Sequence, residues 1–207
     1  MKRFYLSVLF LCFFGSLFAG GPSFAFCDYS QGKVFIQENG EIVWEHKAPD
    51  SNDIWVLPNK NILFTAGKEV LEVSRKNDTI FHYTSESNIF ACQRLKNGNT
   101  FIGECDNGRL LEVSPDGSIV KDVSILPFGV KTGGHAFMRN ARCLDNGHYL
   151  VAHYGGKSVV EYDENGKAVW NIPVPGGAHS VIRLPSGNTL VAVTDKDNNP
   201  GVFEYDM

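Results

Sequence analysis

Along most of this chain, apolar and polar residues alternate in short runs. Turns rich in glycine and asparagine separate these runs. Alternation with a period of two predicts a β-strand that has one apolar and one polar face. Beyond the N-terminal segment, no run shows the 3.6-residue period of an amphipathic helix. The pattern therefore predicts an all-β protein made of many short strands.

One motif occurs four times, and each copy is an apolar residue, a tight turn and an apolar run. Asn-Gly or Ser-Gly in three copies supplies the positive φ angles of a hairpin turn. Lys60 replaces the glycine in the remaining copy, so we expect a different type of turn there. The copies begin at Leu57, Leu95, Leu144 and Leu184, in steps of 38, 49 and 40 residues.

Two further motifs recur in the same order. A strand with a central glutamate contains Glu72, Glu112, Glu161 or Glu204, and we expect these carboxylates on a polar face, where they can pair across units. A turn and another strand occupy 39–44, 77–81, 116–120 and 165–170. Four strands per unit and a period of about 40 residues predict the blades of a β-propeller. A two-layer sandwich is the rival, but it does not require three motifs to recur in order.

The spacing places a propeller domain over residues 20–207. Complete blades are predicted at 51–85, 88–126 and 135–174, and partial blades at 24–47 and 179–207. An insertion around 127–135 accounts for the long third step. Both partial blades supply their second and third strands, so the two ends cannot complete one blade. We therefore expect an incomplete ring, with about two blades missing; the alternative is an open arc or a ring closed by oligomerisation.

The N-terminus resembles a secretory signal peptide. Lys2 and Arg3 precede an apolar run over 4–14, and small residues follow. This run is shorter than the ~20 residues of a membrane-spanning helix, so we expect a signal peptide over 1–19 and no membrane span after its cleavage. The alternative is an uncleaved anchor. The sequence thus predicts an exported protein, either periplasmic or extracellular.

Composition excludes some functions. The chain is 43% hydrophobic and 20% charged, as in a folded globular protein, and its net charge of -4 gives no basic footprint for nucleic acid. Four cysteines remain after the signal peptide: Cys27, Cys92, Cys105 and Cys143. They allow disulfides, but buried thiols are the preferred interpretation because a domain of this size can build a core without covalent links. No Cys-x-x-Cys or His/Cys cluster suggests a metal. Asp195, Asp197 and Asn199 are interpreted as part of a long hairpin turn, and no cofactor is predicted.

The segments 163–170 and 40–44 resemble the quinoprotein-like (PQQ-like) β-propeller repeat. In that family a tryptophan docks one blade on the next, and Trp44 and Trp170 occupy this position. The family's enzymes carry adjacent cysteines, which this chain lacks, so the resemblance does not imply a bound quinone. The Leu-Pro-x-Gly-Asn-x-Leu segment at 184–190 also resembles the repeats of arylsulfotransferase propellers, in which a channel histidine carries the sulfo group; His179 lies just ahead of it.

Candidate ligand-binding residues lie on the first strand of each blade, which lines the channel of a propeller. His135 and His179 are predicted near the start of such strands, and Arg94, Arg142 and Arg183 near their ends. Converging histidine and arginine side chains can bind a sulfate, phosphate or carboxylate. The alternative role is hydrogen bonding to the backbone of neighbouring blades.

Two functional hypotheses follow. The first is a binding or scaffold module whose partner is a protein or a small polar or anionic ligand. The second is an enzyme of the arylsulfotransferase or quinoprotein type that uses the same histidines and arginines. The enzyme predicts that these five side chains converge in one pocket, whereas the scaffold predicts that they scatter or are engaged in structural contacts.

Overall fold

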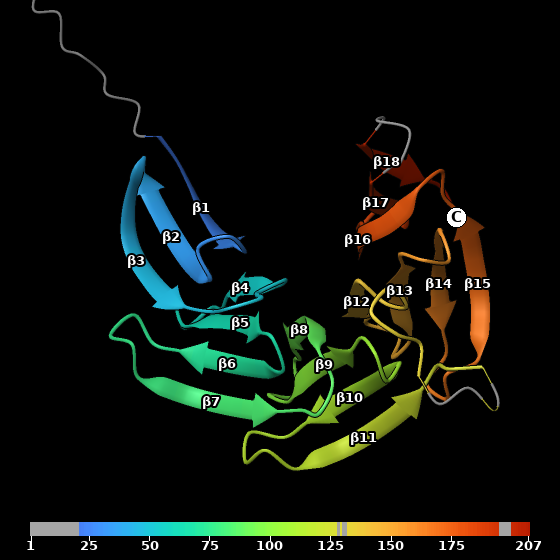
Figure 1. The fold of residues 1–207 in the computed structure, drawn as a ribbon, viewed down its shortest axis with the longest axis horizontal. Coiled ribbons are helices and arrows are strands. Elements are labelled where there is room, and N and C mark those ends of the chain that lie inside the picture. Colours follow the sequence, from blue (N-terminus) through green and yellow to red (C-terminus); the bar gives the residue numbers. More distant parts are fainter. Residues whose placement is uncertain (1–20, 128, 130–131, 195–199) are drawn as a thin grey trace, which may run out of the picture.

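The computed structural model describes residues 21–127, 129, 132–194 and 200–207. Eighteen strands in these residues form five small antiparallel sheets that follow one another around a common axis. Figure 1 looks along this axis and shows an opening between the first and last sheets. The predicted all-β propeller is confirmed, as a five-bladed arrangement with blades of three or four strands. The predicted signal peptide and the turn at 195–199 lie outside the described residues.

The blades follow the chain in order. The first consists of β1 (Gly21–Asp28), β2 (Lys33–Asn39) and β3 (Glu41–Lys47). The second consists of β4 (Ile54–Val56), β5 (Ile62–Ala66), β6 (Glu69–Val73) and β7 (Thr79–Thr84). The third consists of β8 (Ile89–Arg94), β9 (Thr100–Glu104), β10 (Arg109–Val113) and β11 (Ile119–Ser124). The fourth consists of β12 (Asn140–Cys143), β13 (Tyr149–His153), β14 (Ser158–Tyr162) and β15 (Ala168–Pro173). The fifth consists of β16 (Gly177–Arg183), β17 (Thr189–Thr194) and β18 (Gly201–Tyr205).

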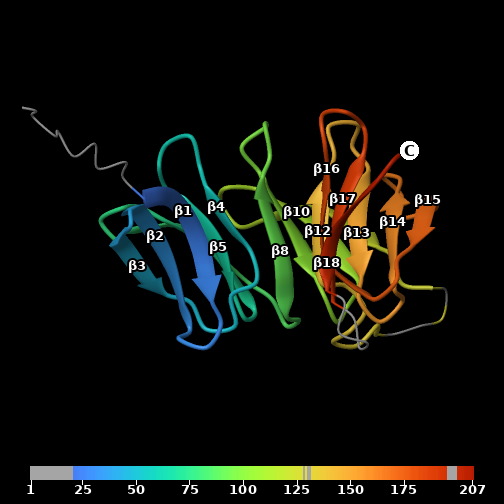
Figure 2. The same cartoon turned by 90° about the horizontal axis from the view of Figure 1, so that it is seen from above.

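Each strand pairs with the next in sequence, so the first strand of a four-stranded blade lies at one edge of its sheet. Figure 1 shows that β4, β8, β12 and β16 lie nearest the axis, and Figure 2 shows the blades from the side. We call these four the inner strands.

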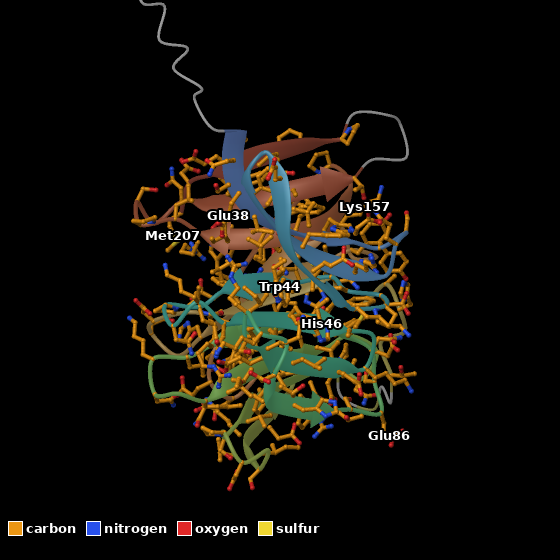
Figure 3. The ribbon with its side chains drawn as sticks, turned by 90° about the vertical axis from the view of Figure 1, so that its left-hand side faces the viewer. Glu38, Trp44, His46, Glu86, Lys157 and Met207 are labelled. Carbon is orange, nitrogen blue, oxygen red and sulfur yellow. The ribbon has the colours of Figure 1, made fainter. Side chains whose placement is uncertain are left out.

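The molecule has two distinct ends along its axis, which Figure 3 shows on opposite sides. Glu38 and Met207 mark the end that carries the first and third hairpin turns of the blades, which we call the turn end. Lys157 and Glu86 mark the other, which carries the middle hairpin turns and the links between blades. We call this the linker end.

The apolar core lies between consecutive blades. Four clusters of buried side chains fill the four interfaces, and the largest fully buried residues belong to them or border them. At the second interface, for example, Leu63 and Val70 of one blade pack against Ile102 and Leu111 of the next. Alternate residues of β5 serve opposite interfaces: Leu63 faces the third blade, whereas Ile62 and Phe64 face the first. The period-two pattern of the sequence is thus the pattern of sheets buried on both faces.

Both tryptophans noted in the sequence lie at blade interfaces. Trp44 is buried with Ile62 and Phe64, and its ring stacks on His46 with 6.0 Å between centroids (Figure 3). Its indole nitrogen has no hydrogen-bond partner among the described residues. Trp170 packs against the interface of the last two blades, under the guanidinium of Arg183. The two rings therefore bury apolar surface between blades.

The turn at Lys60 does not differ from its glycine counterparts, which corrects the expectation from the sequence. The φ of Lys60 is 70°, and the equivalent glycines Gly98, Gly147 and Gly187 have φ values of 90°, 83° and 92°. Each donates its backbone N–H to the carbonyl of the leucine three residues earlier, over 2.8 Å for Lys60 and 3.1 Å for Gly98. The hairpin geometry thus overrides the side-chain preference of a non-glycine residue.

The four cysteines are free thiols in the structure. Cys92 and Cys105 are buried, and Cys27 and Cys143 are half-buried. Burial raises the pKa of each thiol, to about 12 for Cys105. High pKa values keep these groups protonated and weakly nucleophilic. Among the described residues, no helix has the length and hydropathy to cross a membrane.

Candidate functional site

Two adjoining cavities open at the linker end of the axis. The first has a volume of ≈ 390 Å³ and lies between the fourth and fifth blades. Its lining consists of His135, Ala136, Arg139, Tyr154, His179 and Thr194. The second, also ≈ 390 Å³, extends toward the first blade and is lined by Cys27, Tyr29, Ser51 and Asn52 together with Arg139 and His179. Because both cavities share Arg139 and His179, these two side chains lie where they meet.

Arg139 lies at the centre of this site. Its Nη1 is 3.2 Å from Nε2 of His135, and its Nη2 is 3.4 Å from Nε2 of His179. The guanidinium carbon lies 4.5 Å from the ring centroid of Phe90 and 6.0 Å from that of Tyr154. Aromatic faces attract a cation and shield it from water on one side. The three residues His135, Arg139 and His179 form what we call the His–Arg–His cluster.

The two histidines of the cluster accept hydrogen bonds from Arg139. A guanidinium has only donors, so Nε2 of each imidazole must carry the lone pair. Burial and the nearby charge of Arg139 both lower the pKa of His179. His179 is therefore neutral at neutral pH, with its proton on Nδ1, and Arg139 supplies the positive charge of the site.

Local structure fixes the positions of these side chains. His179 lies on β16, and the ring of Tyr154 packs against it edge-on at 6.3 Å. A Cβ atom at Gly177 would lie 2.4 Å from this ring, so glycine allows Tyr154 its place over β16. His135 precedes β12 and packs edge-on against Phe90 at 5.3 Å.

A buried pair anchors the link that carries His135 and Arg139. His153 donates from Nδ1 to the carbonyl of Phe137 over 2.8 Å, and its Nε2 accepts from the hydroxyl of Tyr162 over 2.8 Å. Burial lowers the pKa of His153 and raises that of Tyr162 to about 12. Both groups therefore stay neutral, and this pair positions the link between the third and fourth blades.

The other arginines named from the sequence are engaged elsewhere. Arg94 lies at the end of β8 and pairs with Glu72 of the preceding blade over 2.5 Å. Arg183 lies at the end of β16 and pairs with Glu161 of the preceding blade over 2.7 Å. Each also donates to the carbonyl of the glycine four residues on. These equivalent ion pairs join consecutive blades, in the cross-blade pairing considered for the glutamates.

Arg142 forms a largely buried ion pair between blades that are not neighbours. It makes a two-pronged contact with Asp53, over 2.6 Å to Oδ2 and 3.0 Å to Oδ1, and lies 5.1 Å from the centroid of Trp55. Asp53 also accepts from the backbone N–H of Cys92 over 3.0 Å. The second, third and fourth blades thus meet at the carboxylate of Asp53. Asn140, at the equivalent position of the fourth blade, accepts from Val181 over 3.3 Å in the same way.

Arg139 is the exception among the arginines. Six arginines lie in the described part of the chain, and five of them form ion pairs with Asp or Glu: Arg75, Arg94, Arg109, Arg142 and Arg183. Arg139 forms no ion pair with any described residue. Its charge faces the Nε2 atoms of two imidazoles at the junction of two cavities, where an anion from solution can reach it.

A larger cavity, of ≈ 640 Å³, opens at the turn end. It borders Arg142 and Arg183, but Asp53 and Glu161 neutralise these two side chains. The remaining lining comes mostly from apolar residues such as Leu144, Ile182 and Pro185. We therefore place the candidate site at the linker end, although its cavities are smaller.

The structure brings together two of the five residues named from the sequence, His135 and His179, and separates them from the three arginines. It adds Arg139, which sequence reasoning missed because this residue lies outside the repeated motifs. The available signal was its place just after the insertion at 127–135, since insertions between repeats form loops on one face, often the binding face. Among the described residues, no group of three potential ligands could hold a metal ion.

The chain matches no family model, and no curated protein matches it. Solved structures do resemble it. A protein of unknown function from Bacteroides caccae has a TM-score of 0.73 at 21% identity, over 88% of this chain and 72% of that chain. A streptogramin B lyase has a TM-score of 0.61 at 16% identity, over 89% and 65%. Virginiamycin B lyase from Staphylococcus aureus has a TM-score of 0.58 at 14% identity, over 91% and 70%. At these identities the similarity shows the β-propeller fold alone.

Proposed function

We propose that this protein is a binding module whose His–Arg–His cluster takes up a small anionic ligand at the linker end. The observation that carries the proposal is Arg139, which has no carboxylate partner among the described residues while every other described arginine has one. A sulfate, phosphate or carboxylate accepts charge-assisted hydrogen bonds from a guanidinium. The half-buried position between Phe90 and Tyr154 strengthens such bonds because it excludes water.

Binding of an inorganic anion tests this function directly. We expect the full chain to bind sulfate in isothermal titration calorimetry, and Arg139→Met to weaken binding by about 10- to 100-fold, the contribution of one or two charge-assisted hydrogen bonds. Arg75→Met is the matched control, because it removes the same charge from a surface pair with Glu38. Equal affinities of the Arg139→Met and Arg75→Met variants would contradict the proposal.

An enzyme remains the alternative function, and the resemblance to quinoprotein-like and arylsulfotransferase propellers stays a prediction. A histidine that carries a sulfo group or acts as a base needs a free lone pair. In the cluster, the Nε2 lone pairs of His135 and His179 both accept from Arg139. This geometry favours binding over catalysis. Hydrolysis or transfer of an aryl sulfate by the full chain, lost in His179→Ala, would support the enzyme instead.

A further inference from the structure

The second cavity gives the candidate site a polar extension that inorganic anions do not need. It continues from Arg139 and His179 toward the first blade, so the two cavities together form one elongated site with the guanidinium near its middle. Cavities of a few hundred Å³ suit small organic molecules. A ligand that fills this site therefore extends beyond the group that Arg139 holds.

The wall of this second cavity offers hydroxyl and amide groups. Tyr29, Ser51 and Asn52 line it, and none of them carries a charge. Asn52 donates from its side-chain nitrogen to the carbonyl of Asp50 over 2.8 Å, which leaves its amide oxygen available as an acceptor. Tyr29 is 61% exposed, and its hydroxyl lies near Arg139 and hydrogen-bonds to the carboxylate of Asp50, which leaves the phenol oxygen as an acceptor. Such groups suit the hydroxyls of a ligand, which both donate and accept.

Charge varies along the site in a way that selects between ligand classes. Arg139 makes its middle positive, whereas the carboxylate of Asp50 lies near Tyr29 at the far end and raises the pKa of that phenol. A second anionic group at this far end would be repelled, while a hydroxyl could donate toward it. Tyr154 at the opposite end offers an aromatic wall, which suits the apolar face of a ring.

From this arrangement we propose that the ligand is a hydroxylated carboxylate of the acidic-sugar class, with its carboxylate on Arg139 and its hydroxyls against Tyr29 and Asn52. This inference rests on the proposed function, since it assigns the ligand of the same site. A simple dianion would use Arg139 alone, and a neutral sugar would leave Arg139 without its partner. An acidic sugar uses both parts of the site.

Three probes separate these cases in calorimetry with the full chain: galacturonate, which has carboxylate and hydroxyls; acetate, which has only the carboxylate; and galactose, which has only the hydroxyls. We expect galacturonate to bind roughly ten-fold more tightly than acetate, the effect of two additional hydrogen bonds. Galactose should bind more weakly than galacturonate by at least the same factor. Arg139→Met should weaken galacturonate and acetate alike.

Two variants test the hydroxyl contacts. Tyr29→Phe and Asn52→Leu should each lower the affinity for galacturonate about three-fold or more and leave acetate unchanged, because each removes one hydrogen-bonding group. Tyr205→Phe, which removes a hydroxyl far from both cavities, is the matched control. Thermal unfolding of each variant shows that it has folded, and Tyr29→Phe is the decisive variant because its side chain is exposed.

The outcomes distinguish this inference from the proposed function. Equal binding of galacturonate and acetate, lost together in Arg139→Met, overturns the acidic-sugar assignment and leaves anion binding intact. Galactose binding as tight as that of galacturonate overturns both. Failure of all anions, sulfate included, also overturns both. Galacturonate selectivity that disappears in Tyr29→Phe and Asn52→Leu, but not in Tyr205→Phe, supports both.

Discussion

Two arginines three residues apart in sequence, Arg139 and Arg142, use the same side chain in opposite ways. Arg142 makes a two-pronged ion pair with buried Asp53, and only 14% of its side chain is exposed. Arg139 lies at the linker end, where its nitrogens face His135 and His179. Both guanidinium groups lie near an aromatic ring, Trp55 for Arg142 and Phe90 for Arg139. The difference lies in the acceptor: a carboxylate of the protein for Arg142, and imidazole nitrogens for Arg139.

The acceptor decides whether an arginine stabilises the fold or keeps its charge for a ligand. A buried ion pair joins distant parts of a chain and leaves no charge for a ligand. Asp53 and Arg142 are 89 residues apart and tie the second blade to the fourth, while Cys92 adds the third. Arg139 keeps its charge available, and its neighbours orient it without neutralising it. Arg142, on β12, thus holds blades together, whereas Arg139, in the link just before β12, keeps its charge for the anion that we propose.

The largest expected effect concerns the buried pair. Arg142→Met leaves the carboxylate of Asp53 buried without its counter-charge, so we expect the free energy of unfolding to fall by about 3–5 kcal/mol. Arg139→Met breaks no ion pair with a described residue and should change it by about 1 kcal/mol at most. Urea unfolding followed by circular dichroism measures both.

A double variant sharpens this test. Asp53→Asn removes the charge but keeps an acceptor for the N–H of Cys92, as Asn140 does for Val181 at the equivalent position. Combined with Arg142→Met, it should recover a large part of the lost stability, because no charge remains buried. If Arg142→Met and Arg139→Met lowered the free energy of unfolding equally, the pair between Arg142 and Asp53 would contribute no more to stability than the contacts of Arg139.

The blades could be predicted from the sequence because their determinants are local. Each hairpin turn and each period-two run lies within a few residues, so the repeat reveals them. The ion pairs of the inner strands could not be predicted in the same way. Glu72 and Arg94 belong to different blades, and Asp53 and Arg142 are two blades apart, so their pairing depends on the curvature of the whole arrangement. The three sequence-predicted arginines therefore looked available until their partners were placed.

The second prediction concerns the pair that anchors Arg139 and His135. His153→Phe removes the donor to Phe137 and the acceptor for Tyr162, so the free energy of unfolding should fall by about 2 kcal/mol, since two buried polar groups lose their partner. Sulfate affinity should fall as well, because the anchored link carries the His–Arg–His cluster. Urea unfolding and calorimetry measure the two effects.

Tyr162→Phe provides the matched control for His153→Phe. It removes one hydroxyl but leaves the bond between His153 and the carbonyl of Phe137, so the link keeps its anchor. We expect a smaller loss of stability, about 1 kcal/mol, and unchanged sulfate affinity. If sulfate affinity fell equally in both variants, the anchoring role of His153 would be wrong.

The candidate site could be predicted only in part from the sequence, because the repeat places His179 but not His135 or Arg139. His179 follows the repeat, and its place on an inner strand follows from the register. His135 was predicted at the start of an inner strand, but β12 begins at Asn140 and His135 lies in the link before it. The path of this link depends on contacts such as that between His153 and Phe137, which have no counterpart in the repeat. Arg139 could therefore be located only in three dimensions.

The third prediction gives Arg139 the carboxylate that Arg142 already has. Ala136 is exposed and lines the same cavity as Arg139, so Ala136→Asp introduces an anion beside the guanidinium. We expect sulfate affinity to fall by about ten-fold, because an internal carboxylate competes for the same donors. Ala136→Asn has nearly the same shape without the charge and should retain binding. Loss of binding in Ala136→Asn as well would indicate a steric effect, and retained binding in Ala136→Asp would argue against a site at Arg139.

The smallest expected effect is the dependence of sulfate affinity on pH. Burial and Arg139 lower the pKa of His179 in the free protein. Tyr154 and Thr194 of the same cavity carry no charge, and the carboxylate of Asp50, beside Tyr29 at the second cavity, does not reverse this shift. A bound sulfate raises the same pKa, so binding takes up a proton between the two values. Affinity should therefore increase as pH falls below the usual range of a histidine pKa, and level off once His179 is protonated in the free protein too. A difference of half a pKa unit would give about a three-fold change. Calorimetry across this pH range measures the change in affinity. His179→Gln keeps an acceptor for Arg139 but cannot take up the proton, so it should abolish the pH dependence. His135→Gln should retain the pH dependence that comes from His179. A sulfate affinity that stays constant with pH, or the same slope in His179→Gln, would show that Arg139 receives the anion without help from this histidine.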